Sequence, residues 1–200
     1  MGLIEQIKSW DTSLFLYLNG KHNAFFDLIM SWASSRTVWI PFYVLLLFLI
    51  IREYNKKTWI ILAGVAVMIT LSDQLSVQLF KDVFLRYRPC YNLVIKDMVH
   101  MNTHSGGLYG FVSSHAANSF AIAAYFSVLL RKRYPYFPIL MFFWATLISY
   151  SRIYNGVHYP ADVVVGALLG MVIAFPIAFS FLRWEKRNTT GKNFQSENHE

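Results

Sequence analysis

Three short stretches of the chain combine basic, imidazole and hydroxyl side chains that could together bind and cleave a phosphate ester. They contain Lys81, Arg88 and Pro89 in the first, Ser113, Ser114 and His115 in the second, and Ser151, Arg152, His158 and Asp162 in the third. An arginine offers a planar fork to two phosphate oxygens, and a lysine adds a compact charge. Charges beside apolar segments are costly, so such a group indicates a functional site. The residue types therefore predict a phosphate-binding site.

The pair formed by His158 and Asp162 could supply a nucleophile. His158 stands just before a predicted helix, with Pro160 in the first-turn position that proline favours. Asp162 could accept a proton from one ring nitrogen, which fixes the tautomer and leaves the other nitrogen free to attack. His115 could then protonate the leaving oxygen. We therefore expect phosphoryl transfer through a phosphohistidine.

The serines of the second stretch are expected to open a helix. The unpaired N–H groups and the dipole of that helix would attract an anion. The sequence shows no carboxylate cluster suited to Mg²⁺, so the cations themselves would neutralise the charge of the transition state. Cys90 is the only cysteine, which excludes an intrachain disulfide and a cysteine-based metal site. We expect no metal and no other cofactor.

The elements that position these residues must lie in a membrane. Hydrophobic residues make up 56% of the 200 residues, charged residues 14% and aromatic residues 18%. The mean hydropathy is +0.38. Ordinary soluble domains carry about 25% charged residues, so this supply cannot build a water-facing surface. The composition excludes disorder and a typical cytosolic enzyme, and it predicts an integral membrane protein of one domain.

Five apolar segments predict an all-α membrane bundle of about five transmembrane helices. They cover residues 37–51, 58–80, 116–130, 138–150 and 162–182. In residues 1–36 charges interrupt apolar positions at helical spacing, which indicates interfacial helices. A sixth span through residues 12–35 stays open as an alternative. The expected single domain covers residues 1–187, with its transmembrane core at residues 37–183 and a polar, disordered cytoplasmic tail at residues 188–200.

Basic clusters between the segments indicate the topology. Residues 52–57, 131–133 and 183–192 hold ten Lys and Arg at alternate junctions. The positive-inside rule places these junctions in the cytoplasm. The intervening loops, residues 81–115 and 152–161, therefore share the outer face. The three stretches with the candidate phosphate-binding and catalytic residues lie in those loops or next to them.

The three stretches, in this order, resemble the signature of the type 2 phosphatidic acid phosphatase (PAP2) family. These are membrane lipid phosphatases related to vanadium haloperoxidases, and the resemblance spans residues 37–183. It implies His158 as the nucleophile, Asp162 as its partner and His115 as the acid. The phosphate cradle that it implies consists of Lys81, Arg88, Ser113, Arg152 and the backbone of Ser114.

One motif departs from the family pattern. The usual second motif is Pro-Ser-Gly-His, whereas this chain has Val112-Ser113-Ser114-His115. Replacing proline and glycine changes the stiffness and the allowed backbone angles of a loop. The resemblance therefore carries over the catalytic set but not the shape of this loop.

The resemblance implies a hydrolase of lipid phosphates or pyrophosphates, inhibited by vanadate, at the outer face of the cytoplasmic membrane. Family analogy ranks undecaprenyl pyrophosphate first, then lipid A, then phosphatidylglycerophosphate and phosphatidate. A transporter that binds a lipid phosphate without cleaving it is a remote alternative. The expected partners are the lipid substrate and membrane lipids, with no nucleic acid and no protein partner.

Overall fold

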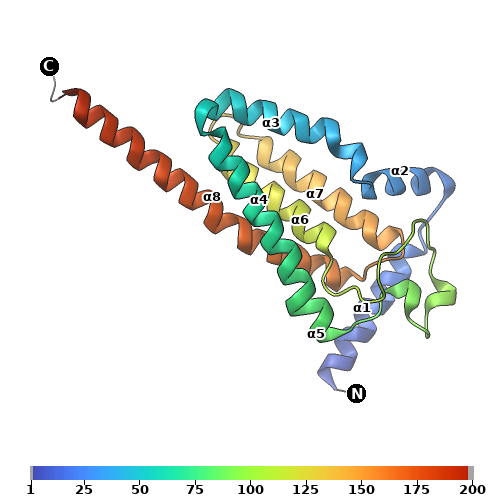
Figure 1. Cartoon of the computed structure of the whole chain (residues 1–200). Helices are drawn as coiled ribbons and strands as arrows, with labels where there is room; N and C mark the ends of the chain where they lie inside the picture. The colour runs from blue at the N-terminus through green and yellow to red at the C-terminus, as the bar shows by residue number, and fades with distance from the viewer. Residues whose placement is uncertain (1, 198–200) are drawn as a thin grey trace.

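The computed structural model describes residues 2–197 as an all-helical chain (Figure 1). The helices are α1 (Leu3–Asn19), α2 (Ala24–Ser34), α3 (Ile40–Tyr54), α4 (Thr58–Leu75), α5 (Asp82–Phe84), α6 (Ser114–Leu130), α7 (Phe137–Tyr154) and α8 (Pro160–Glu197). A π-helical turn, Ser76–Lys81, continues α4 into α5. The expected all-α class is confirmed for the part of the chain that the structure describes.

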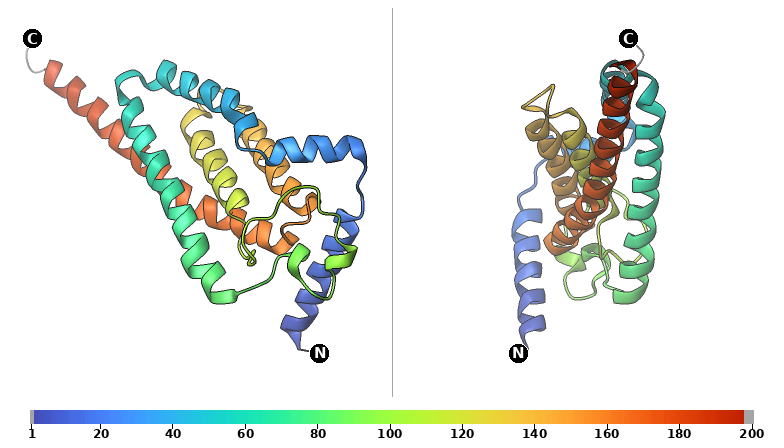
Figure 2. Two further views of the ribbon diagram at one scale, coloured as in Figure 1. Left: turned by 45° about the vertical axis from the view of Figure 1, so that its right-hand side comes forward. Right: turned by 90° about the vertical axis from the view of Figure 1, so that its left-hand side faces the viewer.

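Helix α6 forms the centre of the bundle, with α4, α7 and α8 around it (Figure 2). Small residues allow the closest of these approaches. A Cβ atom added to Gly170 of α8 would lie 2.0 Å from the carbonyl oxygen of Ala117, and one added to Gly166 would lie 2.6 Å from that of Ser113. Glycines four residues apart form the kind of helix face that lets two membrane helices touch. This contact sets the start of α6 against the start of α8.

Two helical stretches combine the length and the hydropathy of a membrane span. They are Thr37–Phe84, which includes the hairpin of α3 and α4, and Pro160–Asn188. Ala24–Ser34 and Ser114–Leu130 are shorter apolar helices. Large apolar side chains such as Val44 and Val172 are 60% and 68% exposed on the outside of the bundle, as expected beside lipid. The structure thus supports a helical membrane protein, while the expected count of five spans is not confirmed.

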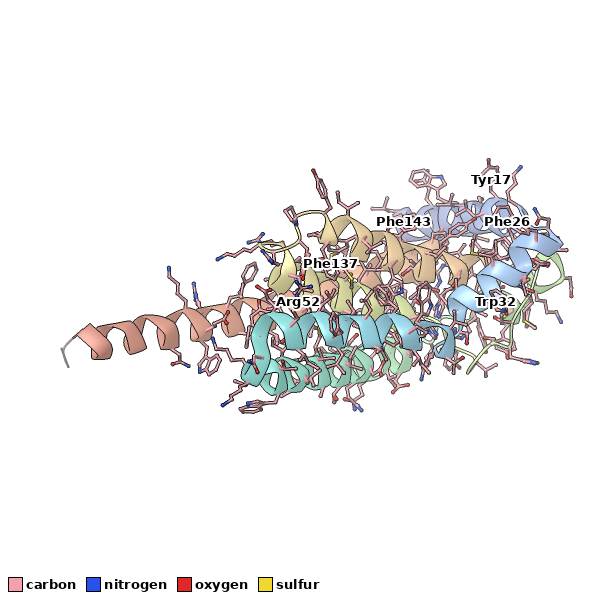
Figure 3. All side chains as sticks on the ribbon, turned by 90° about the horizontal axis from the view of Figure 1, so that it is seen from above. Tyr17, Phe26, Trp32, Arg52, Phe137 and Phe143 are labelled. Atoms are coloured by element: carbon pink, nitrogen blue, oxygen red, sulfur yellow. The ribbon has the colours of Figure 1, made fainter. Side chains whose placement is uncertain are left out.

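Exposed aromatic residues lie toward both ends of the bundle. Figure 3 shows Tyr17, Phe26 and Trp32 at the end that carries α1 and α2 and Arg52 toward the opposite end, and Trp59 and Tyr136 are 69% and 81% exposed. Aromatic rings are typical of both membrane–water interfaces. The arrangement fits a bundle that reaches both interfaces.

The N-terminal segment forms two separate helices. Helix α1 crosses the end of the bundle at a large angle to α8 (Figure 1). It ends at Asn19, and the side chain of Asn23 caps α2 by accepting a hydrogen bond from the N–H of Phe26. The helix is interrupted between Asn19 and Ala24, so residues 12–35 do not form one continuous span. The alternative that one helix through residues 12–35 forms a sixth span is therefore wrong.

The expectation of a disordered tail from residue 188 is wrong for residues 188–197. Helix α8 continues to Glu197, and residues 198–200 lie outside the described residues. The run from Trp184 to Arg187 is rich in good helix formers, so the backbone has no local reason to stop there.

Candidate active site

The predicted residues meet where four helical segments end or begin. Lys81 closes the π-helical turn, Arg152 lies in the last turn of α7, and Asp162 lies in the first turn of α8. His115 is the second residue of α6, and His158 lies in the short loop between α7 and α8. The structure therefore brings residues separated by up to 81 positions of sequence to one end of the bundle.

His158 and Asp162 form a buried pair. Nδ1 of His158 lies 3.4 Å from Oδ2 of Asp162, and the side chains are 3% and 0% exposed. The same Oδ2 accepts a hydrogen bond of 2.9 Å from the backbone N–H of Tyr159. The pair joins the loop before α8 to the first turn of α8, four residues later, and the sequence predicted this pairing.

Arg88 determines which ring nitrogen of His158 carries the proton. Nη1 of Arg88 lies 2.9 Å from Nε2 of His158 and also donates to the carbonyl of Val157. A guanidinium has donors only, so Nε2 must be the acceptor and the proton belongs on Nδ1, toward Asp162. Burial first, and then the charges of Arg88, Arg152 and Lys81, hold the pKa of His158 well below its ordinary value of 6.5. The ring is therefore neutral at pH 7, with its lone pair on the nitrogen that faces the cations.

A tight backbone pairing delivers Arg88 to this place. Tyr87 and Tyr109 form an isolated antiparallel bridge, and the N–H of Arg88 donates to the carbonyl of Leu108. A Cβ atom on Gly110 would lie 3.0 Å from Cγ of Arg88 and 3.4 Å from Nδ1 of His158. Glycine is thus the residue that lets this loop pass beside the His–Asp pair.

The unusual second motif has a specific use in the structure. Ser113 caps α6, because its Oγ accepts from the N–H of Ala116. The next hydroxyl, Ser114 Oγ, accepts a hydrogen bond of 2.8 Å from Nζ of Lys81 and lies 2.8 Å from Oγ of Ser76. A glycine at position 114, as in the family pattern, could not hold Lys81 in this way. The departure therefore adds a hydroxyl group that holds Lys81, a cation of the expected phosphate cradle.

Arg152 is buried with one donor unused. Its Nη1 donates to Oγ of Ser34. Its Nε, by contrast, finds no hydrogen-bond partner among the residues that the structure describes. A buried guanidinium donor without an acceptor is destabilising, and a phosphate oxygen is a suitable acceptor. Arg152 is in this respect prepared for an anionic ligand.

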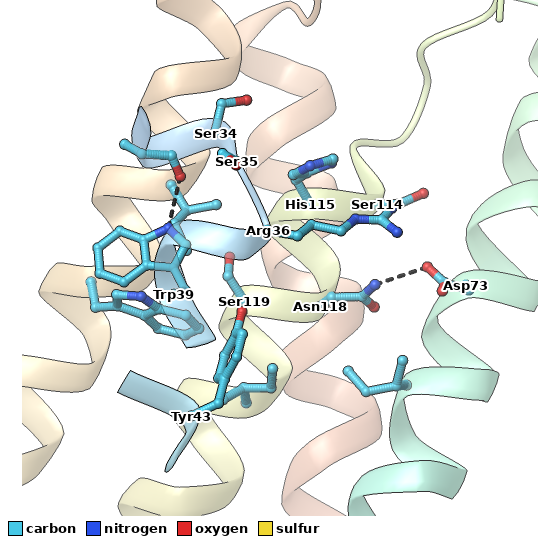
Figure 4. Close-up of a pocket in the computed structure, with 15 residues that line it drawn as sticks. Ser34, Ser35, Arg36, Trp39, Tyr43, Asp73, Ser114, His115, Asn118 and Ser119 are labelled. Carbon is cyan, nitrogen blue, oxygen red and sulfur yellow. Dashed lines mark hydrogen bonds between the residues drawn. The ribbon is translucent and has the colours of Figure 1, made fainter. Parts of the chain in front are cut away.

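His115 lines a cavity of about 310 Å³, and His158 is not among the residues that line it (Figure 4). Arg36, from the link between α2 and α3, stretches across it beside His115. On the α4 side, Asp73 Oδ1 accepts a hydrogen bond of 2.8 Å from Nδ2 of Asn118. Trp39 and Tyr43 form part of its aromatic wall. The cavity thus has a polar mouth at the candidate acid and an apolar interior.

Three further charged residues of this region escaped the sequence reasoning: Arg36, Arg86 and Asp11. Arg86 bridges Asp162 and Asp11 through two ion pairs. Its position two residues before Arg88, on the same side of an extended segment, was the signal that could have revealed it. Asp11 gave no such signal, because nothing in the sequence relates α1 to the motifs.

Together these contacts describe a site for phosphate chemistry. A neutral imidazole nitrogen lies 2.9 Å from Nη1 of Arg88, and the charges of Arg88, Arg152 and Lys81 act on the ring. A second imidazole, His115, is neutral in the empty site, because burial first, and then the charge of Arg152, lower its pKa to about 3. The arrangement can bind a phosphate, attack its phosphorus and supply a proton to the departing oxygen.

Comparisons with known proteins agree with this chemistry. The profile of the PAP2 superfamily matches residues 58–187. The lipid A 4'-phosphatase of Bacteroides thetaiotaomicron is 36% identical over 171 residues, which are 84% of this chain and 75% of that protein. The lipid A 4'-phosphatase of Porphyromonas gingivalis is 31% identical over 85% of this chain and 72% of that protein.

A third relative acts on a different lipid according to its name. The undecaprenyl-diphosphatase of Sulfolobus acidocaldarius is 30% identical over 86% of this chain and 78% of that protein. Among solved structures, the transmembrane PAP2 type phosphatidylglycerolphosphate phosphatase of Bacillus subtilis aligns with a TM-score of 0.69. That alignment covers 89% of this chain and 87% of the other at 18% identity, so it supports the fold.

Proposed function

The chain belongs to the PAP2 superfamily and is a lipid phosphatase, and from that premise we propose that it removes a phosphate from a glycolipid of the lipid A class. Sequence reasoning ranked undecaprenyl pyrophosphate first and lipid A as an alternative. The two lipid A 4'-phosphatases, at 36% and 31% identity, support the alternative better. The similarity to the undecaprenyl-diphosphatase, at 30% identity, makes undecaprenyl pyrophosphate the second candidate substrate.

The observation that carries the choice of substrate is the wall of the cavity beside His115. The acid must face the leaving group, so this cavity is the place for that part of the substrate. Among the described residues that line it, Arg36 is the single permanent cation, and it is opposed by the carboxylate of Asp73. Undecaprenyl pyrophosphate would release undecaprenyl phosphate, an anion that Asp73 would repel, whereas lipid A would release a sugar alcohol. Carboxylate and amide oxygens, here on Asp73 and Asn118, also suit sugar hydroxyl groups.

In the proposed reaction the substrate phosphate accepts hydrogen bonds from Arg88, Arg152 and Lys81. When the bound phosphate offsets the charges of the neighbouring arginines, the pKa of His115 rises and the ring takes up a proton. Nε2 of His158 attacks phosphorus, the bond from phosphorus to the sugar oxygen breaks, and His115 gives that oxygen this proton. Asp162 stabilises the positive charge on the phosphorylated imidazole. A water molecule, losing its proton to His115, then cleaves the phosphorus–nitrogen bond and releases inorganic phosphate.

The finer topology is part of the proposal. We propose about five transmembrane helices in the cytoplasmic membrane, with α1 at the interface and the active site on the outer face. The ten Lys and Arg of the three basic clusters support this orientation. Lipid is the proposed partner, and no protein or nucleic acid partner is proposed.

A substrate panel tests the function. Purified protein would be assayed for phosphate release from lipid A, undecaprenyl pyrophosphate and phosphatidylglycerophosphate, and we expect the highest kcat/KM for lipid A. Asp73→Asn should raise kcat/KM for undecaprenyl pyrophosphate relative to lipid A by about tenfold, the effect of roughly 1.4 kcal/mol of relieved repulsion. Asp97→Asn, an exposed acid in the loop, is the matched control. Preference for undecaprenyl pyrophosphate in the unaltered protein would overturn the proposal.

Metal independence is also proposed, because the cations of the site can take over the electrostatic task of a metal ion. Saturating chelator should change the rate by less than about twofold, and vanadate should inhibit by occupying the place of the phosphate. Loss of activity in chelator that Mg²⁺ restores would contradict this part.

A further inference from the structure

The ion-pair network behind Asp162 extends to the N-terminal helix. We propose that Arg86 and Asp11 are positioning residues for catalysis, and that α1 is therefore part of the catalytic unit. The inference rests on the proposed roles of His158 and Asp162, and it applies whichever lipid phosphate is the substrate.

Arg86 holds two carboxylates with the two ends of its fork. Nη1 lies 2.9 Å from Oδ1 of Asp162, and Nη2 lies 2.6 Å from Oδ2 of Asp11. The side chains of Arg86, Asp11 and Asp162 are 21%, 8% and 0% exposed. The other oxygen of Asp11 accepts a hydrogen bond of 2.9 Å from the backbone N–H of Ala161. Asp11 thus binds both the arginine and the first turn of the helix that carries Asp162.

The two carboxylate oxygens of Asp162 have different partners, and this explains why Arg86 matters. Its Oδ1 is held by Arg86, while its Oδ2 faces the N–H of Tyr159 and Nδ1 of His158. The His158 contact is 3.4 Å, near the long limit of a hydrogen bond. A contact of that length is sensitive to the rotation of the carboxylate. By fixing Oδ1, Arg86 keeps Oδ2 directed at the nucleophilic histidine.

Arg86 is itself held in place by an aromatic ring. Its guanidinium carbon lies 3.9 Å from the centre of the Tyr159 ring. Two contacts fix that ring. Nδ2 of Asn92 donates to the Tyr159 hydroxyl at 2.9 Å, and the Phe15 ring packs edge-on, with 5.3 Å between the two ring centres. A planar guanidinium can stack on a ring while binding two carboxylates, and a lysine ammonium cannot reproduce that geometry.

One face of α1 is built for this contact. Asp11, Phe15 and Asn19 follow each other at spacings of four residues and point to the loops that flank His158. Nδ2 of Asn19 donates to the carbonyls of His100 and Tyr154 at 2.9 and 2.7 Å. The C-terminal half of α1 is thereby fixed to the site, and Asp11 is carried into position.

The test uses the full-length purified protein and the lipid phosphate hydrolysed fastest in the panel above. We expect Asp11→Asn and Arg86→Lys each to lower kcat about 10- to 100-fold and to change KM by less than about twofold, because neither residue touches the substrate. Glu5→Gln, the same change on the exposed side of α1, should leave both constants unchanged. A thermal melt of each variant reports any general loss of folding.

A double variant separates positioning from a merely structural role. If Asp11 acts through Asp162, adding Asp11→Asn to Asp162→Asn should reduce kcat by less than about twofold further. Wild-type kcat in both single variants, or the full additional loss in the Asp162→Asn background, would overturn the inference. His158→Ala distinguishes failure of the mechanism from failure of this inference. Activity in His158→Ala contradicts the proposed mechanism. If His158→Ala is inactive while Asp11→Asn has normal activity, only the positioning role is contradicted.

Discussion

At the scale of single residues, the chemistry depends on cations that serve two purposes. The charges of Arg88, Arg152 and Lys81, added to burial, hold the pKa of His158 well below 6.5. The same charges would bind the phosphate. The empty site therefore keeps its nucleophile neutral, and a bound phosphate would neutralise the cations when the imidazole becomes positively charged.

The first prediction concerns the two histidines. His158→Ala should lower kcat on the order of 10⁴-fold or more, because the phosphohistidine cannot form. His115→Ala should cost less with a lipid pyrophosphate than with a sugar phosphate, because the lipid phosphate that departs is a better leaving group without a proton than a sugar alkoxide. Phosphate release is the measurement, and the exposed His104→Ala is the control. Near-normal turnover in His158→Ala would disprove the mechanism.

The second prediction is a pH dependence of stability. The pKa of His158 is lower in the folded than in the unfolded protein, so below pH 6.5 the unfolded state binds more protons. The stabilising effect of the neutral ring is complete above pH 6.5 and decreases as the pH falls below it, by at most about 1.4 kcal/mol per pH unit. Thermal melts at pH 7.5 and 5.5 should show a smaller decrease for His158→Gln than for the unaltered protein. Equal decreases would contradict the assigned shift.

Sequence reasoning reached residues that chemistry and spacing single out, and it missed those that only the fold brings near. His158 and Asp162 are one helical turn apart, so their pairing could be predicted. The unused Nε of Arg152 and the link from Lys81 to Ser114 depend on how the ends of separate helices pack, which local patterns do not encode.

At the scale of elements, the contact between α6 and α8 sets the distance between the phosphate cradle and the nucleophile. The N–H of Ser113, which caps α6, donates to the carbonyl of Asp162 in α8 at 3.0 Å. The glycines of α8 make that approach possible. Helix packing and catalysis are therefore joined at the same end of two helices.

The third prediction follows from this packing. Gly170→Ala places a methyl group 2.0 Å from the carbonyl oxygen of Ala117, so the helices must move apart. We expect a loss of about 1–3 kcal/mol in stability and a reduced kcat, measured by thermal melts and phosphate release. Val172→Ala, on the exposed side of the same helix, should change neither appreciably. An unaltered melt for Gly170→Ala would show that the helices can yield at no cost.

Apolar runs in the sequence predicted the positions of the helices well, but they gave no information on how the loops fold. The segment expected at residues 116–130 is α6 at Ser114–Leu130, and that expected at residues 138–150 is α7 at Phe137–Tyr154. The long connection between α5 and α6 has no such period. Its fold over the bundle end, through the bridge of Tyr87 with Tyr109, could not be predicted from local sequence.

At the scale of the whole molecule, the two ends differ. The site and α1 lie at one end, and Arg52, which belongs to one of the basic clusters, lies toward the other (Figure 3). This polarity matters because it decides which leaflet can present a substrate.

The fourth prediction tests that orientation. A membrane-impermeant thiol reagent should label Cys90, which is half-buried beside Arg88, in intact spheroplasts. In a Cys90→Ser background, Lys132→Cys should be labelled only after lysis, because residues 131–133 form a basic cluster of the expected cytoplasmic side. The reverse pattern would place the site in the cytoplasm and favour phosphatidate or phosphatidylglycerophosphate as substrates.

The clamp made by Asp11 also has a consequence for biosynthesis. A ribosome makes Asp11 150 residues before Ala161, the backbone group that it binds. Arg86 emerges between the two, and Asp162 only with the final helix. Before α8 is made, α1 can contact Arg86 and, through Asn19, His100, but the hydrogen bond from Ala161 to Asp11 cannot form. A nascent or prematurely terminated chain that lacks α8 has no assembled nucleophile, so hydrolytic competence requires translation through the start of α8.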